Sequence, residues 1–425
     1  MTDDLSIAVA AREAPDRVAI ETASRSLSFA ACAAAVAAGP RPPAAIVATP
    51  AIETVLAVHA ALAAPSPIAL LHHRLASDEA ERQRALVERA QLPGDAAVIL
   101  FTSGSTGAAR GVVLSRPALL AAAHASAQHL GWRDTDRWLL ALSLAHAGGL
   151  SIVVRCLAAR RPIVLCDRDF DRDIVAQLLE RCTLASLVPA QLAALLDDPA
   201  WRPPAGLRAV LLGGAAAPPA LLDRAAARGV PFLTTYGMTE TLGQLATAPP
   251  DRAGDPNAPL VPLPGVTLEA GSPRAPGPIV VRAPMLATSY LGGAPIAPAF
   301  TTADLGHLAG RTLHIAGRRD DVIITGGENV HPAAIEAVLA ATPGVRTACV
   351  FGVRDERWGQ VVAAAIAVAP SFEVRAATAH WHAALPAHAR PRRLAICLAL
   401  PLLPSGKVDR RAAAALPFAV VDYHR

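Results

Sequence analysis

Short apolar runs alternate with alanine-rich helical segments through most of the chain, and this alternation limits the folds that it can adopt. The runs within 44–49, 161–167 and 207–214 are apolar on both faces, as strands buried inside a sheet must be. Segments with helical spacing of alanine and leucine follow them, as at 52–64 and 218–229. We therefore predict an α/β fold with largely parallel sheets and flanking helices.

The amino-acid composition changes after Pro249. From there to about Phe300 the chain is rich in proline and glycine, with short β-like pieces, which predicts a small β subdomain. A strand, a charged break, a second strand, a Gly-Gly turn and a helix follow within 314–341, and more strands and a helix come after them. We divide the chain into an N-terminal body, 1–319, and a small α+β C-terminal domain, 320–425.

Charge and hydropathy bear on two classes of protein, nucleic-acid binders and membrane-spanning proteins. Lys and Arg number 39 against 35 Asp and Glu, for a net charge of +4, and the basic residues are scattered, which argues against a nucleic-acid partner. The mean hydropathy of +0.36 raises the question of a membrane span. The most apolar stretch, 138–154, has His146 and a Gly-Gly pair at its centre, so we predict a strand, a turn and a buried helix start instead.

The first residues of the sequence and the cysteines indicate the cellular compartment. The beginning "MTDDLS" is acidic and polar, so we expect no signal peptide and a soluble, cytoplasmic protein. The 6 cysteines form neither a CxxC pair nor a metal spacing, and we expect them to be reduced and mostly buried.

The stretch "ILFTSGSTGAARGVVLS", 99–115, carries the first chemical signal. An apolar run breaks into small residues from Thr102 to Ala108, reaches the cation Arg110, and becomes apolar again at Val112. Such a loop offers closely spaced N–H groups and hydroxyl donors, which can cradle a phosphate. It is not the GxxxxGK[ST] loop, because no Lys-Ser/Thr pair follows at that spacing. By composition alone a surface loop and an anion site remain equal alternatives.

Other polar segments follow the loop in order along the chain. "TTYGMTET", 234–241, follows an apolar strand and sets hydroxyls beside Glu240. "TADLG" holds Asp304, "GRRDD" holds Arg318, and "LPSGKVDR" holds Lys407. In this order the segments resemble the signature motifs of the adenylate-forming superfamily, which includes acyl- and aryl-CoA ligases, luciferases and peptide-synthetase adenylation domains. The resemblance covers nearly the whole chain.

The resemblance implies an ATP site and an acyl-adenylate intermediate. Glu240 would bind Mg²⁺, a hard cation that prefers carboxylate oxygen. Thr239 would touch the α-phosphate, and Lys407 would bridge the substrate carboxylate and the α-phosphate as the adenylate forms. The residues that would hold the terminal phosphates are Thr102, Ser103, Gly104, Ser105, Thr106, Gly107 and Arg110.

The resemblance also implies nucleoside contacts and a second half-reaction. Tyr236 would lie against the adenine, and Asp304 would accept hydrogen bonds from the ribose hydroxyls with support from Arg318. After adenylation the C-terminal domain would turn about Asp320, where the backbone torsions change. Gly326-Gly327 would then line the tunnel of the pantetheine thiol, with coenzyme A as the acceptor. A plain tight hairpin at this Gly-Gly pair stays an alternative.

The acid is indicated by the segments between 143 and 247. "SLVPAQLAALL", "AVLLGGAAAP" and "YGMTETLGQLAT" look most like the o-succinylbenzoate–CoA ligases of menaquinone biosynthesis. His146 matches the position of a gating or acid-contacting histidine, and Arg155 is a candidate for a second carboxylate, although it could equally face solvent. The residues expected around the acid are His146, Ser151, Arg155, Gly213, Gly214, Ala215, Gly237, Met238 and Gln244.

Two departures from the family pattern keep alternatives open. Ala109-Arg110 replaces the usual Pro-Lys, which keeps the charge but changes its geometry, and Ala303 replaces the usual Gly before Asp304. One alternative is loading of another aryl acid, of the benzoate type, onto CoA or the phosphopantetheine of an acyl carrier protein. A second alternative is a degenerate nucleotide-binding protein that does not turn over. For the oligomeric state, a homodimer is one possibility that the sequence leaves open.

Overall fold

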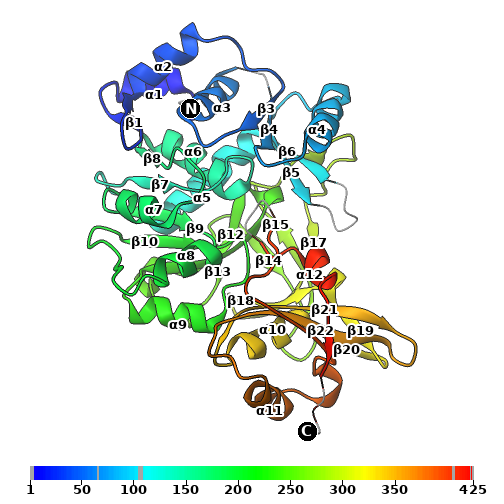
Figure 1. Cartoon of the computed structure of the whole chain (residues 1–425). Coiled ribbons are helices and arrows are strands. Elements are labelled where there is room, and N and C mark those ends of the chain that lie inside the picture. The colour runs from blue at the N-terminus through cyan, green and yellow to red at the C-terminus, as the bar shows by residue number, and fades with distance from the viewer. Residues whose placement is uncertain (1–3, 65–66, 104–108, 404–406, 422, 424–425) are drawn as a thin grey trace. The chain divides into compact units, whose positions relative to one another are not determined.

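The computed structural model describes residues 4–64, 67–103, 109–403, 407–421 and 423, and it is a mixed α/β protein, as predicted (Figure 1). Two compact units account for the backbone contacts. The first comprises Met1–Ala216, Arg224–Leu268 and Val281–Phe300. The second comprises Ala217–Asp223, Glu269–Val280 and Thr301–Arg425. The predicted boundary at 319/320 concerns the part of the chain that would move, and it stays a prediction.

The larger sheet of the first unit is nine-stranded, in the order β13-β12-β11-β10-β9-β7-β8-β1-β2. Its centre, from β1 to β11, is parallel, and β2, β12 and β13 add antiparallel edges. The central strands are fully buried, which explains why they are apolar on both faces. The strands are β1 (Val18–Glu21), β2 (Ser26–Ser28), β7 (Trp138–Leu140), β8 (Ile163–Leu165), β9 (Leu184–Leu187), β10 (Ala209–Leu212), β11 (Phe232–Met238), β12 (Gly243–Thr247) and β13 (Val261–Pro262).

A five-stranded sheet in the same unit has the order β16-β6-β5-β4-β3. Strands β3, β4 and β5 are parallel, and β6 and β16 are antiparallel to their neighbours. The strands are β3 (Ala45–Ala48), β4 (Ile68–His72), β5 (Ala96–Ser103), β6 (Ala109–Ser115) and β16 (Ser289–Tyr290).

Helices accompany these sheets, as the alternation predicted (Figure 1). Ser28 and Ser115 begin α2 and α5 by accepting hydrogen bonds from backbone N–H groups of the first turn. The helices are α1 (Ile7–Glu13), α2 (Phe29–Ala38), α3 (Ile52–Ala63), α4 (Ser77–Arg89), α5 (Arg116–Leu130), α6 (Ala147–Ala159), α7 (Arg172–Leu179), α8 (Pro189–Leu196) and α9 (Pro219–Ala227). Strand β7, the turn and α6 confirm the prediction for 138–154. In the described part of the chain no helix is both long and apolar enough to cross a membrane.

The predicted small β subdomain is a four-stranded sheet, in the order β14-β15-β17-β18, and it continues past Phe300 to Arg318. Its strands are β14 (Thr267–Glu269), β15 (Gly277–Arg282), β17 (Phe300–Ala309) and β18 (Thr312–Arg318). Strands β13 and β16, from the same proline-rich region, pair with the two large sheets instead.

The C-terminal part of the second unit packs a sheet against helices, in the strand order β20-β19-β22-β23-β24, with β21 paired to β22. Trp381 lies fully buried in its core, where its indole N–H donates to Thr342 at 2.8 Å. The elements are β19 (Ile323–Thr325), β20 (Glu328–Val330), α10 (Pro332–Ala340), β21 (Val345–Asp355), β22 (Gly359–Val368), α11 (Val374–Ala384), β23 (Arg393–Cys397), α12 (Arg410–Ala414) and β24 (Ala419–Val420).

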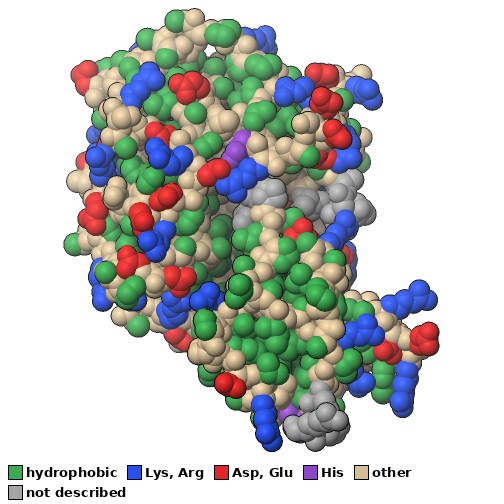
Figure 2. All heavy atoms as spheres, in the orientation of Figure 1, with side chains coloured by type: hydrophobic (Ala, Val, Ile, Leu, Met, Phe, Trp, Pro, Cys, Tyr) green, Lys and Arg blue, Asp and Glu red, His purple; other side chains and the backbone are tan. Residues whose placement is uncertain are grey.

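On the face shown in Figure 2, basic and acidic side chains are interspersed. The cysteines are mostly buried, as the sequence predicted. All 6 cysteines are free, and Cys397 alone among them is partly exposed. Burial raises the pKa of the Cys32 thiol to about 11 and that of Cys182 to about 12, so both stay protonated near neutral pH.

Candidate active site

The small-residue loop joins the two strands of a β-hairpin. In the antiparallel pair β5–β6, Thr102 lies opposite Arg110 and Ser103 opposite Ala109. The Thr102 hydroxyl donates to the Arg110 carbonyl at 3.4 Å. The hairpin therefore brings a hydroxyl residue and the loop's cation together at the base of the loop. The predicted phosphate contacts Gly104, Ser105, Thr106 and Gly107 lie outside the described residues.

The second polar segment is a tight turn at the end of β11. Strand β11 carries Tyr236 and runs directly into the 3₁₀ turn η1 (Thr239–Thr241). A Cβ atom on Gly237 would lie 1.2 Å from the Gly243 carbonyl oxygen, so only glycine fits there. The Thr241 hydroxyl donates to the Met238 carbonyl at 3.1 Å and tightens the turn.

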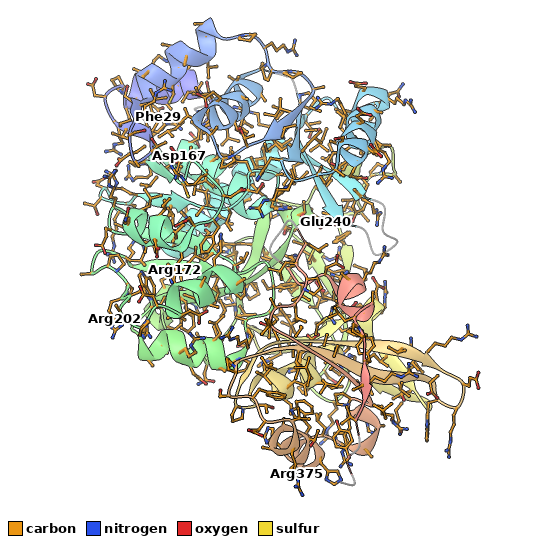
Figure 3. The ribbon with its side chains drawn as sticks, in the orientation of Figure 1. Phe29, Asp167, Arg172, Arg202, Glu240 and Arg375 are labelled. Atoms are coloured by element: carbon orange, nitrogen blue, oxygen red, sulfur yellow. The ribbon has the colours of Figure 1, made fainter. Side chains whose placement is uncertain are left out.

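The turn η1 contacts β6 and so lies beside the hairpin (Figure 3). Glu240, at the centre of η1, accepts a hydrogen bond at Oε1 from the Tyr290 hydroxyl, 2.8 Å away. The Arg110 guanidinium carbon lies 3.9 Å from the centroid of the Tyr290 ring. Burial, and then the nearby Glu240 carboxylate, raises the pKa of Tyr290, so the phenol keeps its proton and donates. The structure thus brings two predicted residues, Arg110 and Glu240, onto one tyrosine.

Sequence reasoning missed Tyr290. The only available signal was its rarity, because the chain has 3 tyrosines and this one stands between apolar and glycine-rich segments.

His146, the predicted gating histidine, is the N-cap residue of α6, and its ring packs beside one other imidazole. Its ring lies 5.1 Å from that of His72, which stacks on His73 at 4.7 Å. His73 Nε2 lies 2.7 Å from Asp169 Oδ1. Burial first, and then its positive neighbours, lowers the pKa of His72 to about 4, so His146 packs against a neutral ring near pH 7. The adjacent residues His72 and His73 were not predicted to be site residues from the sequence.

Arg155 is buried and does not face solvent, which rules out that alternative. It follows Ser151 by one helical turn on α6, and its guanidinium carbon lies 5.4 Å from the centroid of the Trp138 ring. Burial lowers the pKa of Arg155 to about 10. Within the described part of the chain Arg155 makes no ion pair, and its Nε is buried without a hydrogen-bond partner. A buried guanidinium without an ion-pair partner in the described chain favours the binding of an anionic ligand.

Some of the other residues expected around the acid form hydrogen bonds within the protein. The Gln244 side chain accepts from the Ser126 hydroxyl and donates to the Thr247 hydroxyl, each at 2.9 Å. The Ser151 hydroxyl donates to the Gly148 carbonyl at 2.9 Å, which leaves its oxygen able to accept. Gly213 and Gly214 follow β10, and Gly214 has φ +82°; Ala215 beside them is exposed.

In the second unit, the register of the β17–β18 hairpin places Asp304 directly opposite Arg318. Their side chains form an ion pair of 3.4 Å, and Arg318 Nη2 lies 3.9 Å from an Asp320 carboxylate oxygen. Asp320 lies in the 3₁₀ turn η3 (Arg319–Asp321), directly after β18. The hairpin therefore brings the two predicted ribose contacts together next to the predicted hinge.

The Gly-Gly pair is the two-residue turn of the hairpin β19–β20. Gly326 and Gly327 have φ +58° and +87°, the combination of a type I′ turn. A Cβ atom on Gly326 would also lie 2.7 Å from the Trp358 ring. The alternative of a plain tight hairpin describes the backbone correctly, and a role toward a thiol stays a prediction.

Lys407 is exposed and lies just before α12, where its carbonyl accepts a hydrogen bond from the Leu403 N–H at 2.7 Å. Helix α12 is anchored by Arg410, which sequence reasoning also missed. Its guanidinium lies 2.8 Å from Glu336 Oε1 and 3.5 Å from Asp321 Oδ2. One side chain therefore ties the Lys407 segment to the predicted hinge.

The predicted magnesium site can be judged by the side-chain ligands that the structure offers. Among the described residues, no group of three or more His, Cys, Asp or Glu side chains could by itself hold a metal ion. Magnesium in ATP-dependent enzymes is held by one or two carboxylates together with substrate phosphates, so it does not need such a cluster. Glu240, with one oxygen bound by Tyr290 and a second oxygen besides, fits that demand.

Comparisons with known proteins point to one family. The family described as AMP-binding enzyme matches residues 21–291, and its C-terminal domain matches residues 334–407. The 2-succinylbenzoate–CoA ligase of Geobacillus kaustophilus is 39% identical over 285 residues, which are 63% of this chain and 58% of that protein. The chain thus spans less than two thirds of that relative. The probable 2-succinylbenzoate–CoA ligase of Mycobacterium tuberculosis is 38% identical over 342 residues, 76% of this chain and 85% of that protein.

A similar fold is found in solved structures. The o-succinylbenzoate CoA synthetase (MenE) of Bacillus subtilis, in complex with the acyl-adenylate intermediate OSB-AMP, has a TM-score of 0.84 at 28% identity, over 95% of this chain and 96% of that one. The same Bacillus protein in complex with ATP and magnesium ion has a TM-score of 0.84, over 95% and 98%.

Proposed function

This chain belongs to the family of AMP-binding enzymes, and on that premise we propose that it is an AMP-forming acid–CoA ligase that acts on o-succinylbenzoate. The reaction supplies an activated thioester to menaquinone biosynthesis, and a cytoplasmic location suits its small-molecule substrates. The names of the relatives support the reaction class and the acid.

The burial of Arg155 is the observation that supports o-succinylbenzoate as the substrate. An unpaired cation inside a protein is costly, and a carboxylate in bidentate contact with it offsets that cost. o-Succinylbenzoate has two carboxylates, one to be activated and one left over. The left-over carboxylate would bind Arg155, while His146 and Ser151 on the same helix, with Gly213, Gly214, Ala215, Gly237, Met238 and Gln244, would enclose the rest.

In the first half-reaction the acid carboxylate attacks the α-phosphorus of ATP and pyrophosphate leaves. The hairpin loop, Thr102 to Gly107, with Arg110 would hold the terminal phosphates through N–H groups, hydroxyls and one guanidinium. Thr239 would donate to the α-phosphate. Lys407 would stabilise the charge that builds up between the carboxylate and the α-phosphate.

Two further sets of residues would bind the nucleotide. Tyr236 would lie against the adenine, and Asp304, oriented by Arg318, would accept from the ribose hydroxyls. Glu240 would hold Mg²⁺, which when bound neutralises phosphate charge.

In the second half-reaction a thiol takes the acyl group from AMP. The C-terminal domain, 320–425, would rotate about Asp320 and present the Gly326-Gly327 turn to the pantetheine arm. Free CoA is the proposed acceptor, and a carrier-protein phosphopantetheine is the alternative. The assembly of two chains into a homodimer stays a prediction.

Acid-dependent release of AMP, with ATP and CoA, tests the proposal. The panel holds o-succinylbenzoate, benzoates, hydroxybenzoates, anthranilate and medium-chain fatty acids. Strong preference for o-succinylbenzoate with free CoA is the expected result. Adenylation without transfer to CoA would favour a carrier protein, preference for a monocarboxylate would replace the substrate, and nucleotide binding with no turnover would support the degenerate alternative.

A further inference from the structure

We propose that Tyr290 is a positioning residue that holds the Glu240 carboxylate and the Arg110 guanidinium apart and in fixed orientations for magnesium and nucleotide binding. The inference rests on the proposed function, because that function gives Glu240 the metal and Arg110 the phosphates.

The side chain of Tyr290 contacts both charged groups with different atoms. Its hydroxyl donates to Glu240 Oε1 at 2.8 Å, because an ionised carboxylate can only accept. Its ring face lies 3.9 Å from the Arg110 guanidinium carbon, within the range of a cation–π contact. Both contacts can form at once, since one uses the edge and the other the face of the same ring.

The backbone around Tyr290 is tied to the two segments that carry these charges. In the pairing of β16 with β6, Tyr290 lies opposite Val112, and the Leu291 N–H donates to the Gly111 carbonyl at 2.7 Å. A few residues earlier, the Ala287 N–H donates to the carbonyl of Glu240 itself at 2.7 Å. The segment is thus fixed to the strand of Arg110 and to the turn of Glu240.

The close approach at Gly111 makes this arrangement specific. A Cβ atom there would lie 2.9 Å from the Leu291 Cβ, so a larger residue would push β16 away from β6. Tyr290 would move with it. The ring position is therefore set by the packing of the two strands and not by the two polar contacts alone.

The contacts of Tyr290 affect how the two opposite charges beside it interact. Arg110 and Glu240 carry opposite charges and contact the same side chain, yet they form no ion pair with each other in the described structure. A direct pair would occupy the carboxylate and the guanidinium together. Tyr290 instead takes one acceptor site of Glu240 and the face of Arg110, which leaves the second carboxylate oxygen for a cation and the guanidinium edge for phosphate.

Binding of Mn²⁺, measured by electron paramagnetic resonance with a non-hydrolysable ATP analogue, tests the role of the hydroxyl. Tyr290→Phe removes the hydroxyl and keeps the ring. We expect Mn²⁺ affinity to fall about tenfold, as is typical when a partner of a metal ligand is lost. Binding of the analogue in EDTA, followed by calorimetry, is expected to stay within about twofold, because the Arg110 contact remains.

Two further variants separate positioning from general damage. Tyr290→Leu removes ring and hydroxyl, and should weaken analogue binding in EDTA as well as Mn²⁺ binding. Tyr423→Phe is the matched control, because the Tyr423 hydroxyl donates to the Pro391 carbonyl at 3.0 Å and Arg390 lies 6.0 Å from its ring. It should change neither measurement.

Failure of this inference can be told from failure of the proposed function. If the native chain binds Mn²⁺ with the analogue and Tyr290→Phe binds it equally well, Tyr290 does not position Glu240. An equal loss in Tyr423→Phe would likewise overturn the positioning role. If the native chain binds no Mn²⁺ with the analogue, the proposed function is wrong and the inference is lost with it.

Discussion

Replacing Arg155 by methionine should raise or preserve the stability of the protein while it removes most of the activity with o-succinylbenzoate. Burial lowers the pKa of Arg155 from 12.5 to about 10. At about 1.4 kcal/mol per pKa unit, burying the charge costs on the order of 3 kcal/mol. Methionine keeps the length and apolar character of the side chain and removes the charge, so this cost disappears.

The effect on catalysis should have the opposite sign. Loss of one partner of a buried charge pair costs about 2–5 kcal/mol, and a loss of about 3 kcal/mol lowers kcat/KM about 150-fold. Steady-state release of AMP with o-succinylbenzoate measures this loss. Benzoate lacks the second carboxylate, so any activity with it should change less than about threefold.

Arg208→Met is the matched control for stability. Arg208 pairs with Asp136, which is fully buried, at 2.9 and 2.6 Å, and its loss would leave that carboxylate alone. Breaking such a pair should cost about 3–5 kcal/mol in urea unfolding. If Arg155→Met destabilises the chain as much as Arg208→Met does, or leaves kcat/KM for o-succinylbenzoate within about threefold, the proposed pairing of Arg155 with substrate is refuted.

Three other predictions concern the half-reactions and the pH dependence of stability. Lys407→Ala should slow adenylation by at least about 100-fold, the typical loss of a transition-state charge contact, and spare thioester formation from a supplied acyl-adenylate; equal loss in both steps would contradict its role. Asp320→Pro should do the reverse, because a fixed φ hinders the hinge, and normal thiolation would mean that the hinge lies elsewhere. His59, on α3, is 1% exposed with both ring nitrogens lacking a hydrogen-bond partner in the described structure, and burial lowers its pKa to about 4. Since the unfolded imidazole binds a proton below about pH 6.5 and the folded one does not, stability should fall as the pH drops from 6.5 toward 4. Between pH 7 and pH 5, His59→Leu should lose about 2 kcal/mol less in urea unfolding than the native chain, and an unchanged loss would show that His59 does not set it.

Much of the secondary structure could be predicted because its causes are local. The run at 44–49 became β3, the helical segment at 52–64 became α3, and the Gly-Gly pair became a hairpin turn. Side-chain periodicity and backbone freedom depend on neighbours in the chain, so they can be read without a structure. The order of the polar segments indicated the family for a similar reason, since each motif is a short contiguous stretch.

The contacts among distant segments were decided by the tertiary structure. Arg155 could have faced water or the interior, and its burial depends on how α6 packs, which the local pattern leaves open. Gln244 was expected to meet the acid, and its amide is held between Ser126 and Thr247.

Tyr290 shows the limit of the sequence most clearly. The sequence by itself determined which residues bear charge and which strand or turn carries them. That one phenol touches both Arg110 and Glu240 depends on the pairing of β16 with β6 and on the bond from Ala287 to η1. Such contacts join residues far apart in the chain, and their energy comes from packing and hydrogen bonds that exist only after the sheet has assembled.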